Sequence, residues 1–304
     1  MTQHTTEFGR VAVCMGGWAN EREVSLNTGT AVLTALQAAD VDAHRVDIQQ
    51  ATVLQQIQGY DRIFNCVHGR GGEDGQLTGA LQLLGIPCTG SGVLGSALAM
   101  DKYRTKLTWR GLDLPTPDCI LLTTEEDLTL AEQLGYPMMV KAATEGSSIG
   151  VARVKNPAEL QAAWTEARAC DSHVIAERCI IGTEYTASIL DNQALPLIQV
   201  KTPHTFFDYT AKYQTNNTEF LIPCGLNETT EHRLQALCLT AFQALDCRGC
   251  GRVDFMLDKT QQPWLIEVNT VPGMTEHSLV PKAAAAIGMD FQTLVLSILA
   301  QTLS

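Results

Sequence analysis

The 304-residue sequence has no long uninterrupted apolar run and no cluster of basic residues. No stretch approaches the roughly 18 consecutive apolar residues of a membrane-spanning helix, and the opening MTQHTTEFGR lacks the charged-then-apolar pattern of a signal peptide. We therefore expect a cytoplasmic protein with no membrane partner. Lys and Arg number 21 against 33 Asp and Glu, a net charge of −12. Nucleic acid is therefore not an expected partner.

Cysteine pairs with the spacing of a disulfide framework or a zinc site are also scarce. The ten cysteines are scattered through otherwise apolar segments, as small buried hydrophobic residues are in a reducing compartment. Cys247 and Cys250, in CRGC, have redox or metal spacing, but no second pair or nearby His completes a zinc site. We interpret both as core residues, and no disulfide is needed to explain the others.

The composition of the sequence is typical of a globular protein, and its first part predicts strands that alternate with helices. Apolar residues make up 45% of the chain and charged residues 18%, enough for a sizeable core in two or three domains. VAVCMGG, RIFNCV and IPCTGSG predict strands that alternate with helices, which indicates a parallel sheet. Asn20 and Glu23 predict a capping box for the first helix.

A hairpin-like pattern begins near residue 137. PMMVKAA and GVARV predict two strands joined by the polar loop TEGSSIG. Asn156, Pro157 and Glu159 then predict a helix start with an N-cap, a first-turn proline and a capping glutamate. Further strands are predicted in HVIAERCI, TEYTASIL and LPLIQVK.

Two predicted strands near the C-terminus place carboxylates in an apolar setting. Alternation puts Arg252 and Asp254 on one face of GRVDFMLD, and Leu265, Glu267 and Asn269 on one face of WLIEVNT. Pairing these strands would bring Asp254, Glu267 and Asn269 together. Two carboxylates and an amide oxygen are costly to desolvate without a hard cation, so the pattern favours magnesium over a solvated sheet face.

Lys141 and the loop after it indicate a phosphate contact. Lys141 ends the apolar run PMMV, and the small residues of TEGSSIG could close over phosphates with their backbone N–H groups. The alternative is a surface lysine beside an ordinary hairpin, and the predicted magnesium site argues against it. HGRGGEDG and GGWANEREVS match neither GxGxxG nor the P-loop, which disfavours a dehydrogenase or a P-loop kinase.

Eight segments follow one another in an order that resembles a known family. They are GGWANEREVS, HGRGGEDGQLTG, TGSG, MDK, EGSSIGV, AKY, GRVDFMLD and EVNTVPGMTEHSLVP. Together they span nearly the whole chain and resemble the D-alanine:D-alanine ligases of the ATP-grasp superfamily. Ala142 after Lys141, and Val271 before PG, depart from the commonest family pattern without removing a ligand.

The resemblance implies a mixed α/β, three-domain ATP-grasp fold. Residues 1–95 would form an N-terminal α/β domain with a parallel sheet, 96–181 a central subdomain with a nucleotide-gripping hairpin, and 182–304 a C-terminal subdomain. ATP would lie between the last two. The polar segment 202–220 would act as a lid that excludes water. A homodimer is expected from the same resemblance.

The resemblance also implies which residues bind ATP and metal. Lys102 and Lys141 would contact phosphates, and Asp254, Glu267 and Asn269 would hold two Mg²⁺ ions, with Mn²⁺ as a substitute. Residues 177–180 would line the adenine site. The nucleotide set is Lys102, Lys141, Glu145, Ser147, Ser148, Glu177, Arg178, Cys179, Ile180, Glu184 and Lys212.

Other residues would bind the two amino acids. Glu21 would meet the ammonium of the first D-alanine, and His68 is either a contact to this substrate or a cap for local backbone groups. The implied substrate set is Glu21, His68, Lys212, Ser278 and Leu279, and the implied catalytic set is Glu21, Ser147, Tyr213, Arg252, Gly273 and Ser278.

The implied reaction makes D-alanyl-D-alanine for peptidoglycan precursors. The carboxylate of one D-alanine would attack the γ-phosphate of ATP, and the amine of the other would displace phosphate from the resulting acyl phosphate. A relay through Ser147, Tyr213 and Glu21 would take up the proton. The alternatives are a D-alanine:D-lactate ligase, another ATP-grasp carboxylate-amine ligase, or a non-catalytic nucleotide-binding regulator that would tolerate loss of Glu21 and Arg252.

Overall fold

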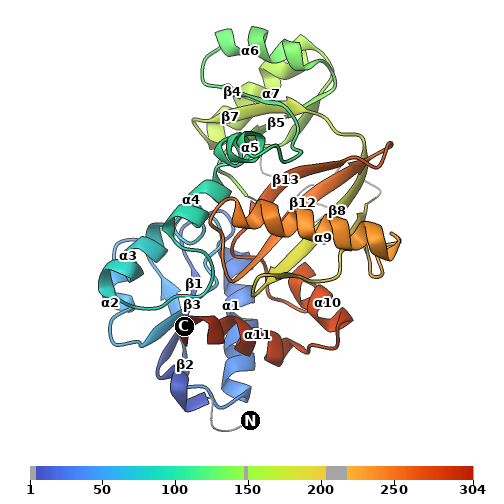
Figure 1. Ribbon diagram of the computed structural model, residues 1–304. Helices are drawn as coiled ribbons and strands as arrows, with labels where there is room; N and C mark the ends of the chain where they lie inside the picture. Colours follow the sequence, from blue (N-terminus) through green and yellow to red (C-terminus); the bar gives the residue numbers. More distant parts are fainter. Residues whose placement is uncertain (1–4, 147–149, 203–217, 304) are drawn as a thin grey trace.

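The computed structural model describes residues 5–146, 150–202 and 218–303. In this part of the chain the strands form three separate sheets, of three, four and six strands (Figure 1). None of the described helices is by itself long and apolar enough to cross a membrane. The pair Leu279–Ala286 and Phe291–Leu303 passes that test only as two helices bent by 105°.

The N-terminal sheet is parallel, as the alternation of strands and helices predicts. Strand β1 lies between β2 and β3 and pairs with both in parallel. All six residues of β1 are buried, because helices cover both faces of the sheet. The elements are η1 (Thr5–Phe8), β1 (Val11–Gly16), α1 (Arg22–Ala38), β2 (Ala43–Ile48), α2 (Val53–Gln56), β3 (Arg62–Asn65) and α3 (Gln76–Leu84).

The predicted capping box at the start of α1 is wrong. The helix begins at Arg22, and Glu21 occupies the N-cap position without a side-chain capping bond. Arg22 forms a bidentate pair with Asp47, at 2.8 Å for both contacts. This pair fixes the first turn of α1 to the end of β2. The Glu21 carboxylate therefore has no capping role and lines a cavity instead.

Two helices lead from the first sheet to the second. They are α4 (Val93–Met100) and α5 (Lys102–Gly111). Asp101 caps α5 by accepting a hydrogen bond from the Arg104 N–H at 3.0 Å. The fully buried Trp109 donates its indole N–H to the Ala241 carbonyl at 2.9 Å, which anchors α5 to α9. The lysines of α5 are thereby held in fixed positions.

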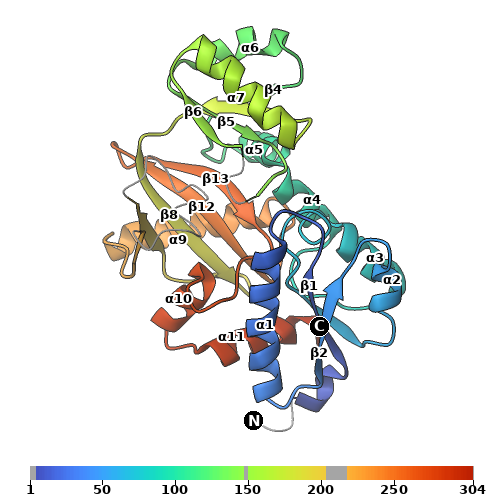
Figure 2. The same cartoon turned by 180° about the vertical axis from the view of Figure 1, so that it is seen from behind.

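The second sheet has the strand order β4-β7-β5-β6 and is antiparallel. Helix α7 begins as predicted: the Asn156 side chain accepts from the Glu159 N–H at 2.9 Å, and Pro157 is the first helical residue. Figure 2 shows α7 lying across one face of this sheet. The elements are β4 (Cys119–Leu122), α6 (Glu126–Ala131), η2 (Glu132–Leu134), β5 (Met138–Ala142), β6 (Ala152–Val154), α7 (Pro157–Cys170) and β7 (Val174–Arg178).

The third sheet has the order β11-β10-β8-β12-β13, with β9 pairing β8 at one end. Helix α9 packs on one face, around Val253 and Phe255. Helix α11 packs instead against α1, so that both ends of the chain share one buried cluster (Figure 2). The elements are β8 (Gly182–Leu190), β9 (Gln193–Ala194), β10 (Ile198–Lys201), β11 (Glu219–Leu221), α9 (Glu228–Gln243), β12 (Cys250–Asp258), β13 (Pro263–Asn269), α10 (Leu279–Ala286), α11 (Phe291–Ala300) and η3 (Gln301–Leu303).

All ten cysteines are free. Cys247 and Cys250 are buried, and the Cys247 thiol donates to the Gly95 carbonyl. Burial raises the pKa of both thiols to about 12. Their interpretation as core residues is confirmed.

The turn between β12 and β13 makes stability sensitive to acid. Asp258 accepts hydrogen bonds from Trp264, Thr260 and Gln262, led by the Trp264 indole, and these lower its pKa from 3.8 to about 2. The pKa of Asp258 is lower in the folded than in the unfolded protein. The hydrogen bonds of its carboxylate therefore contribute fully to the free energy of unfolding above about pH 4, and this contribution is lost as the pH falls through about 2. We expect Asp258→Asn to flatten the dependence of the free energy of unfolding on pH in this window. Urea titrations at several pH values would measure it, and parallel curves for both proteins would contradict the assignment.

Candidate active site

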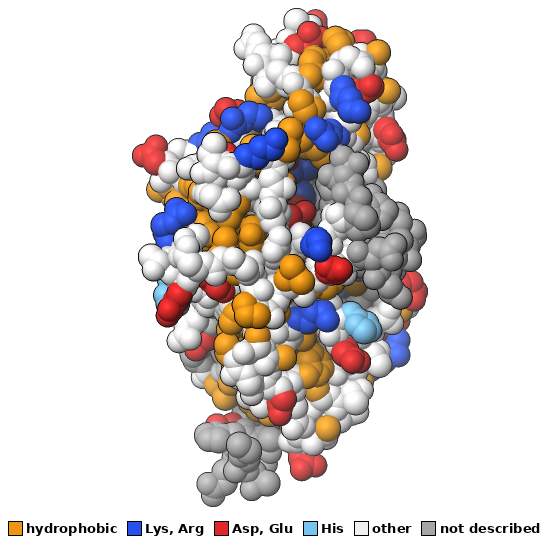
Figure 3. All heavy atoms as spheres, turned by 90° about the vertical axis from the view of Figure 1, so that its right-hand side faces the viewer, with side chains coloured by type: hydrophobic (Ala, Val, Ile, Leu, Met, Phe, Trp, Pro, Cys, Tyr) orange, Lys and Arg blue, Asp and Glu red, His pale blue; other side chains and the backbone are white. Residues whose placement is uncertain are grey.

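Two cavities meet in the middle of the molecule. Cavity A, of about 400 Å³, lies between the second and third sheets, and cavity B, of about 550 Å³, lies between the third sheet and the loops of the N-terminal sheet. Lys102 and Glu267 line both. Figure 3 shows basic and acidic side chains at the bottom of a recess on this side of the surface. A ligand in each cavity would therefore meet the other at these two side chains.

A buried cluster of two lysines and one glutamate lies beside cavity A: Lys141 and Glu177 line the cavity, and the fully buried Lys106 lies behind them. Lys141 Nζ lies 2.6 Å from Glu177 Oε1, and Lys106 Nζ lies 3.0 Å from Glu177 Oε2. Burial by itself would raise the pKa of the Glu177 carboxyl, but the two neighbouring lysines outweigh burial and lower this pKa. Burial likewise opposes the charge of Lys141, yet Glu177 and Glu267 outweigh it and raise its pKa. Glu177 and Lys141 are therefore charged, and the cluster presents a cation to the cavity.

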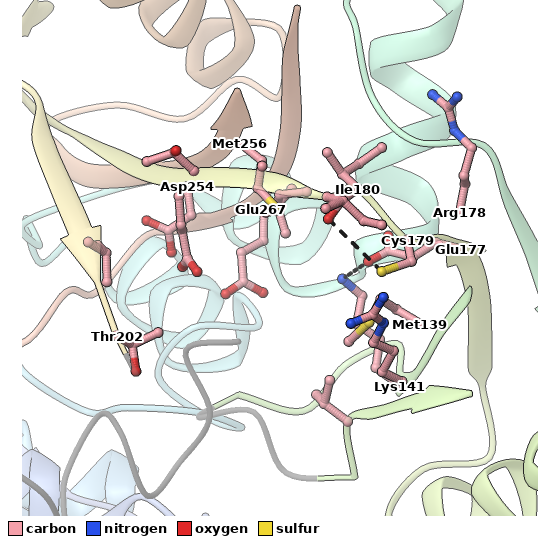
Figure 4. A pocket seen from close by; sticks show the side chains of 18 of the residues that line it. Met139, Lys141, Glu177, Arg178, Cys179, Ile180, Thr202, Asp254, Met256 and Glu267 are labelled. Carbon is pink, nitrogen blue, oxygen red and sulfur yellow. Dashed lines mark hydrogen bonds and ion pairs between the residues drawn. The ribbon is translucent and has the colours of Figure 1, made fainter. Parts of the chain in front are cut away.

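The end of β7 supplies the wall next to this cluster. Arg178, Cys179 and Ile180 all line cavity A, together with Glu184 from β8. The Arg178 guanidinium stacks over Trp264, 4.2 Å from the ring centroid. Figure 4 shows Glu177, Cys179 and Ile180 side by side along this wall. Burial raises the pKa of the Cys179 thiol, so at neutral pH the group acts as an apolar lining.

The predicted metal ligands lie together on β12 and β13. Asp254 pairs directly with Glu267, and Arg252 with Asn269. Figure 4 shows the Asp254 and Glu267 carboxylates pointing into the same space. Asn269 Oδ1 accepts from the Val271 N–H at 3.0 Å, which orients the amide. These side chains form a group of oxygen donors, as the strand patterns indicate.

The predicted facing of Leu265 is wrong. The pairing shifts by one residue between Asp254 and Phe255, so that Ile266 is an extra residue in β13. Leu265 is consequently buried with Phe255 in the core under α9, whereas Glu267 lines the cavities. A strict period of two cannot place all three side chains on one face when a bulge intervenes.

Arg252 and Asp254 point together as predicted. Arg252 Nε and Nη2 donate to Asp254 Oδ1 and Oδ2 at 2.8 and 2.7 Å. Both side chains are about 13% exposed. This planar, bidentate contact holds the guanidinium at the edge of cavity B.

Lys102 lies at the junction of the cavities. Its Nζ donates to the Glu145 carbonyl at 2.7 Å and lies 3.5 Å from Glu267 Oε2. Arg70 reaches across from the N-terminal sheet to Thr144 at 2.6 Å and to Glu145 at 3.2 Å. The loop that follows Lys141 is thus tied both to α5 and to the N-terminal loop.

Cavity B brings Glu21, His68, Gly273, Ser278 and Leu279 together from separate parts of the chain. His68 is buried, with one ring nitrogen 3.1 Å from Thr28 Oγ1 and the other 3.3 Å from Glu73 Oε1. These are side-chain partners, so His68 does not cap local backbone groups. His68 lines cavity B with its two ring nitrogens next to Thr28 and Glu73.

Glycines let the walls of cavity B approach each other closely. A Cβ on Gly69 would meet Glu21 Oε2 at 2.8 Å, and one on Gly146 would meet it at 2.7 Å. A Cβ on Gly273 would lie 2.9 Å from Ser278 Oγ. A side chain at any of these three positions would therefore collide with the Glu21 carboxylate or the Ser278 hydroxyl, so glycine is required there.

Comparisons with known proteins agree with this geometry. The family model described as the D-ala D-ala ligase C-terminus matches residues 108–300. A D-alanine–D-alanine ligase of Stutzerimonas stutzeri (strain A1501) is 54% identical over 305 aligned positions, which cover 99% of this chain and 97% of the relative. The chain belongs to the D-alanine–D-alanine ligase family.

Solved structures of this ligase family confirm the ATP-grasp fold. The crystal structure of the enzyme from Bacillus anthracis has a TM-score of 0.88 at 34% identity. The same enzyme complexed with ATP has a TM-score of 0.86 at 32% identity. Each match covers 97% of this chain and 97% of that enzyme.

Four predicted site residues of this ligase lie outside the described residues. They are Ser147, Ser148, Lys212 and Tyr213. Conversely, Lys106 and Arg70 contact the cavity-lining residues Glu177 and Glu145 and were missed. Lys106 stands four residues after Lys102, a spacing that places both on one helix face. Arg70 follows His68 in VHGRGG, where it resembles an ordinary exposed residue.

Proposed function

We propose that this chain is an ATP-dependent ligase that joins two molecules of D-alanine through an acyl phosphate, giving ADP and phosphate, for peptidoglycan synthesis. The observation that supports it most is the junction of two cavities at Lys102 and Glu267. A nucleotide in cavity A would end with its phosphates where cavity B holds the amino acids. Holding two reactants in contact in this way can lower the activation free energy by up to about 7–11 kcal/mol relative to the reaction between free molecules in solution.

ATP suits cavity A because of the way charge is arranged along it. The wall formed by Cys179, Ile180 and Ile181 offers apolar surface and backbone groups to a base, and Glu184 lies beyond it for the ribose hydroxyls. Lys102 lies on the side that adjoins cavity B, Lys141 lines cavity A beside Glu177, and both would contact the phosphates. The triphosphate would thus extend from the wall at Cys179 and Ile180 towards Lys102 and cavity B.

In the first step the carboxylate of one D-alanine attacks the γ-phosphate. Glu21 would hold the ammonium group of this substrate, and His68 would lie beside it. Lys102 and Arg252 would offset the negative charge that accumulates as carboxylate and phosphate meet. The gain in rate comes from positioning and electrostatic stabilisation rather than from a nucleophile of the protein.

In the second step the amine of the other D-alanine attacks the acyl phosphate. Arg252 and the Gly273 N–H would face the developing oxyanion, and a single such donor typically contributes about 3 kcal/mol. Ser278 and Leu279 at the start of α10 would orient this substrate. We propose that a relay of Glu21 with Ser147 and Tyr213 takes the proton from the amine.

Magnesium fits the donors between the cavities. Asp254, Glu267 and Asn269 offer hard oxygen atoms, and Asp254 and Glu267 pair across neighbouring strands. No group of three or more His, Cys, Asp or Glu side chains suited to a metal occurs among the described residues. Ions here would therefore rely on Asn269 and on phosphate oxygens as well. When bound, they would neutralise phosphate charge, and Mn²⁺ should substitute for Mg²⁺.

The test is ATP turnover with D-alanine, L-alanine and D-lactate supplied separately, and with D-alanine and D-lactate together, followed by the mass of the product. We expect ADP release to depend on D-alanine and on Mg²⁺, and the product to be D-alanyl-D-alanine. Turnover only with D-alanine and D-lactate together, giving an ester, would favour the D-alanine:D-lactate alternative. ATP binding without turnover would favour the regulator.

We propose domain boundaries after residues 95 and 181 and a lid over 202–220, of which 203–217 lie outside the described residues. We also propose a cytoplasmic homodimer without nucleic acid or membrane partners. Exposed apolar side chains at Leu83 and Leu94, on α3 and α4, support self-association. Sedimentation equilibrium would give twice the 33.0 kDa chain mass for a dimer.

A further inference from the structure

Cavity B contains a lysine that the proposed chemistry does not use. Lys282 lies on α10, one turn after Ser278, and its N–H donates to the Ser278 carbonyl at 3.2 Å. Side chains four residues apart lie on the same helix face, and both Lys282 and Ser278 line cavity B. The lysine therefore reaches the space in which Ser278 would orient the second D-alanine.

The other cations of cavity B are already matched with acidic or carbonyl groups. Lys102 contacts Glu145 and Glu267, and Arg252 pairs with Asp254. Within the described residues Lys282 forms no salt bridge. Its Nζ makes a cation–π contact with Phe220, 5.9 Å from the ring centroid. Phe220 lines the same cavity from β11. Lys282 is half-buried and lines cavity B, so it is available to an anion there.

The proposed reaction supplies one anion that needs such a partner. The carboxylate of the first D-alanine is consumed at the phosphate, whereas the carboxylate of the second remains through both steps and ends the product. We propose that Lys282 binds this second carboxylate. It would thereby select an amino acid, rather than an amine that lacks a carboxylate, as the attacking substrate. The inference rests on the proposed ligase function.

Steady-state kinetics of Lys282→Met test this assignment. With D-alanine varied over a range that separates its two binding sites, we expect the KM for the second D-alanine to rise about tenfold, as for loss of a charge-assisted contact. The first KM, the KM for ATP and kcat should change less than about twofold. Lys282→Arg should restore the second KM, and Lys259→Met, in the exposed turn after β12, serves as the matched control.

D-alaninamide separates a role in binding from a role in folding, because it retains the amine and lacks the carboxylate. In competition with D-alanine, Lys282→Met should raise the share of D-alanyl-D-alaninamide in the product about tenfold. If Lys282→Met does not fold, the salt dependence of the wild-type enzyme tests the same contact. Added KCl should raise the KM for D-alanine at the second site and leave the KM for D-alaninamide unchanged. An unchanged product share or equal salt effects on both acceptors would overturn the assignment. Absence of any dipeptide from the wild-type enzyme would instead refute the ligase function.

Discussion

Lys102→Met should lower kcat for dipeptide formation by about 10²–10³-fold. Lys102 is the cation that lines both cavities, and its Nζ is fixed by the Glu145 carbonyl at 2.7 Å. A group placed there contacts charge that develops only as the carboxylate approaches the phosphate. Its loss should therefore appear in kcat more than in the KM for D-alanine.

Initial rates of ADP release at saturating D-alanine would measure this effect. Lys155→Met, which removes an exposed lysine just before α7, is the control and should keep wild-type kcat. Thermal melting should show that Lys102→Met remains folded. A kcat within threefold of wild type would show that the junction of the cavities is not where phosphoryl transfer takes place.

Lys106→Met should destabilise the fold by about 3–5 kcal/mol, the usual cost of breaking a buried ion pair from one side. Lys106 has no exposed surface, and besides Glu177 it contacts Thr116 Oγ1 at 3.0 Å and the Leu265 carbonyl at 3.4 Å. Its contact with Glu177 is an ion pair without a well-directed hydrogen bond. Without Lys106, the buried carboxylate retains Lys141 alone.

The double variant Lys106→Met/Glu177→Gln provides the sharper comparison. Removing the carboxylate along with its partner leaves no under-compensated charge, so we expect the double variant to be more stable than Lys106→Met alone. Lys201→Met is the control, because the Lys201–Glu219 pair is more than 60% exposed on both sides and should contribute less than about 1 kcal/mol. Urea unfolding at pH 7 gives the free energies of unfolding of the wild type, Lys106→Met, Glu177→Gln, the double variant and Lys201→Met. Additive losses from the two single substitutions would contradict a coupled cluster.

Local patterns predicted the secondary structure well where the residues interact with near neighbours. The start of α7 at Asn156 and Pro157 depends on bonds within one turn, and the hairpin of β12 and β13 depends on alternation within each strand. The bulge at Ile266 was not visible, since it follows from how two strands pair and not from either strand alone. The same limit explains the wrong capping box: Asn20 and Glu23 have the right spacing, but α1 begins at Arg22, and Glu21 lines a cavity formed with distant parts of the chain.

The site residues divide in the same way. Asp254, Glu267 and Asn269 could be predicted because polar groups inside apolar strands demand a partner. Lys106 could not, because it differs from a surface lysine only once α5 packs against Glu177 and Leu265. Its single signal was the four-residue spacing from Lys102, which any amphipathic helix also shows.

The transfer of ¹⁸O from substrate to phosphate tests the central claim most directly, namely that the carboxylate of one D-alanine attacks the γ-phosphate of ATP. D-alanine labelled in both carboxylate oxygens would be incubated with ATP, Mg²⁺ and the enzyme in unlabelled water, and the released phosphate would be analysed by mass. An acyl phosphate requires one labelled oxygen in each phosphate released. Phosphate without label, formed together with dipeptide, would contradict it.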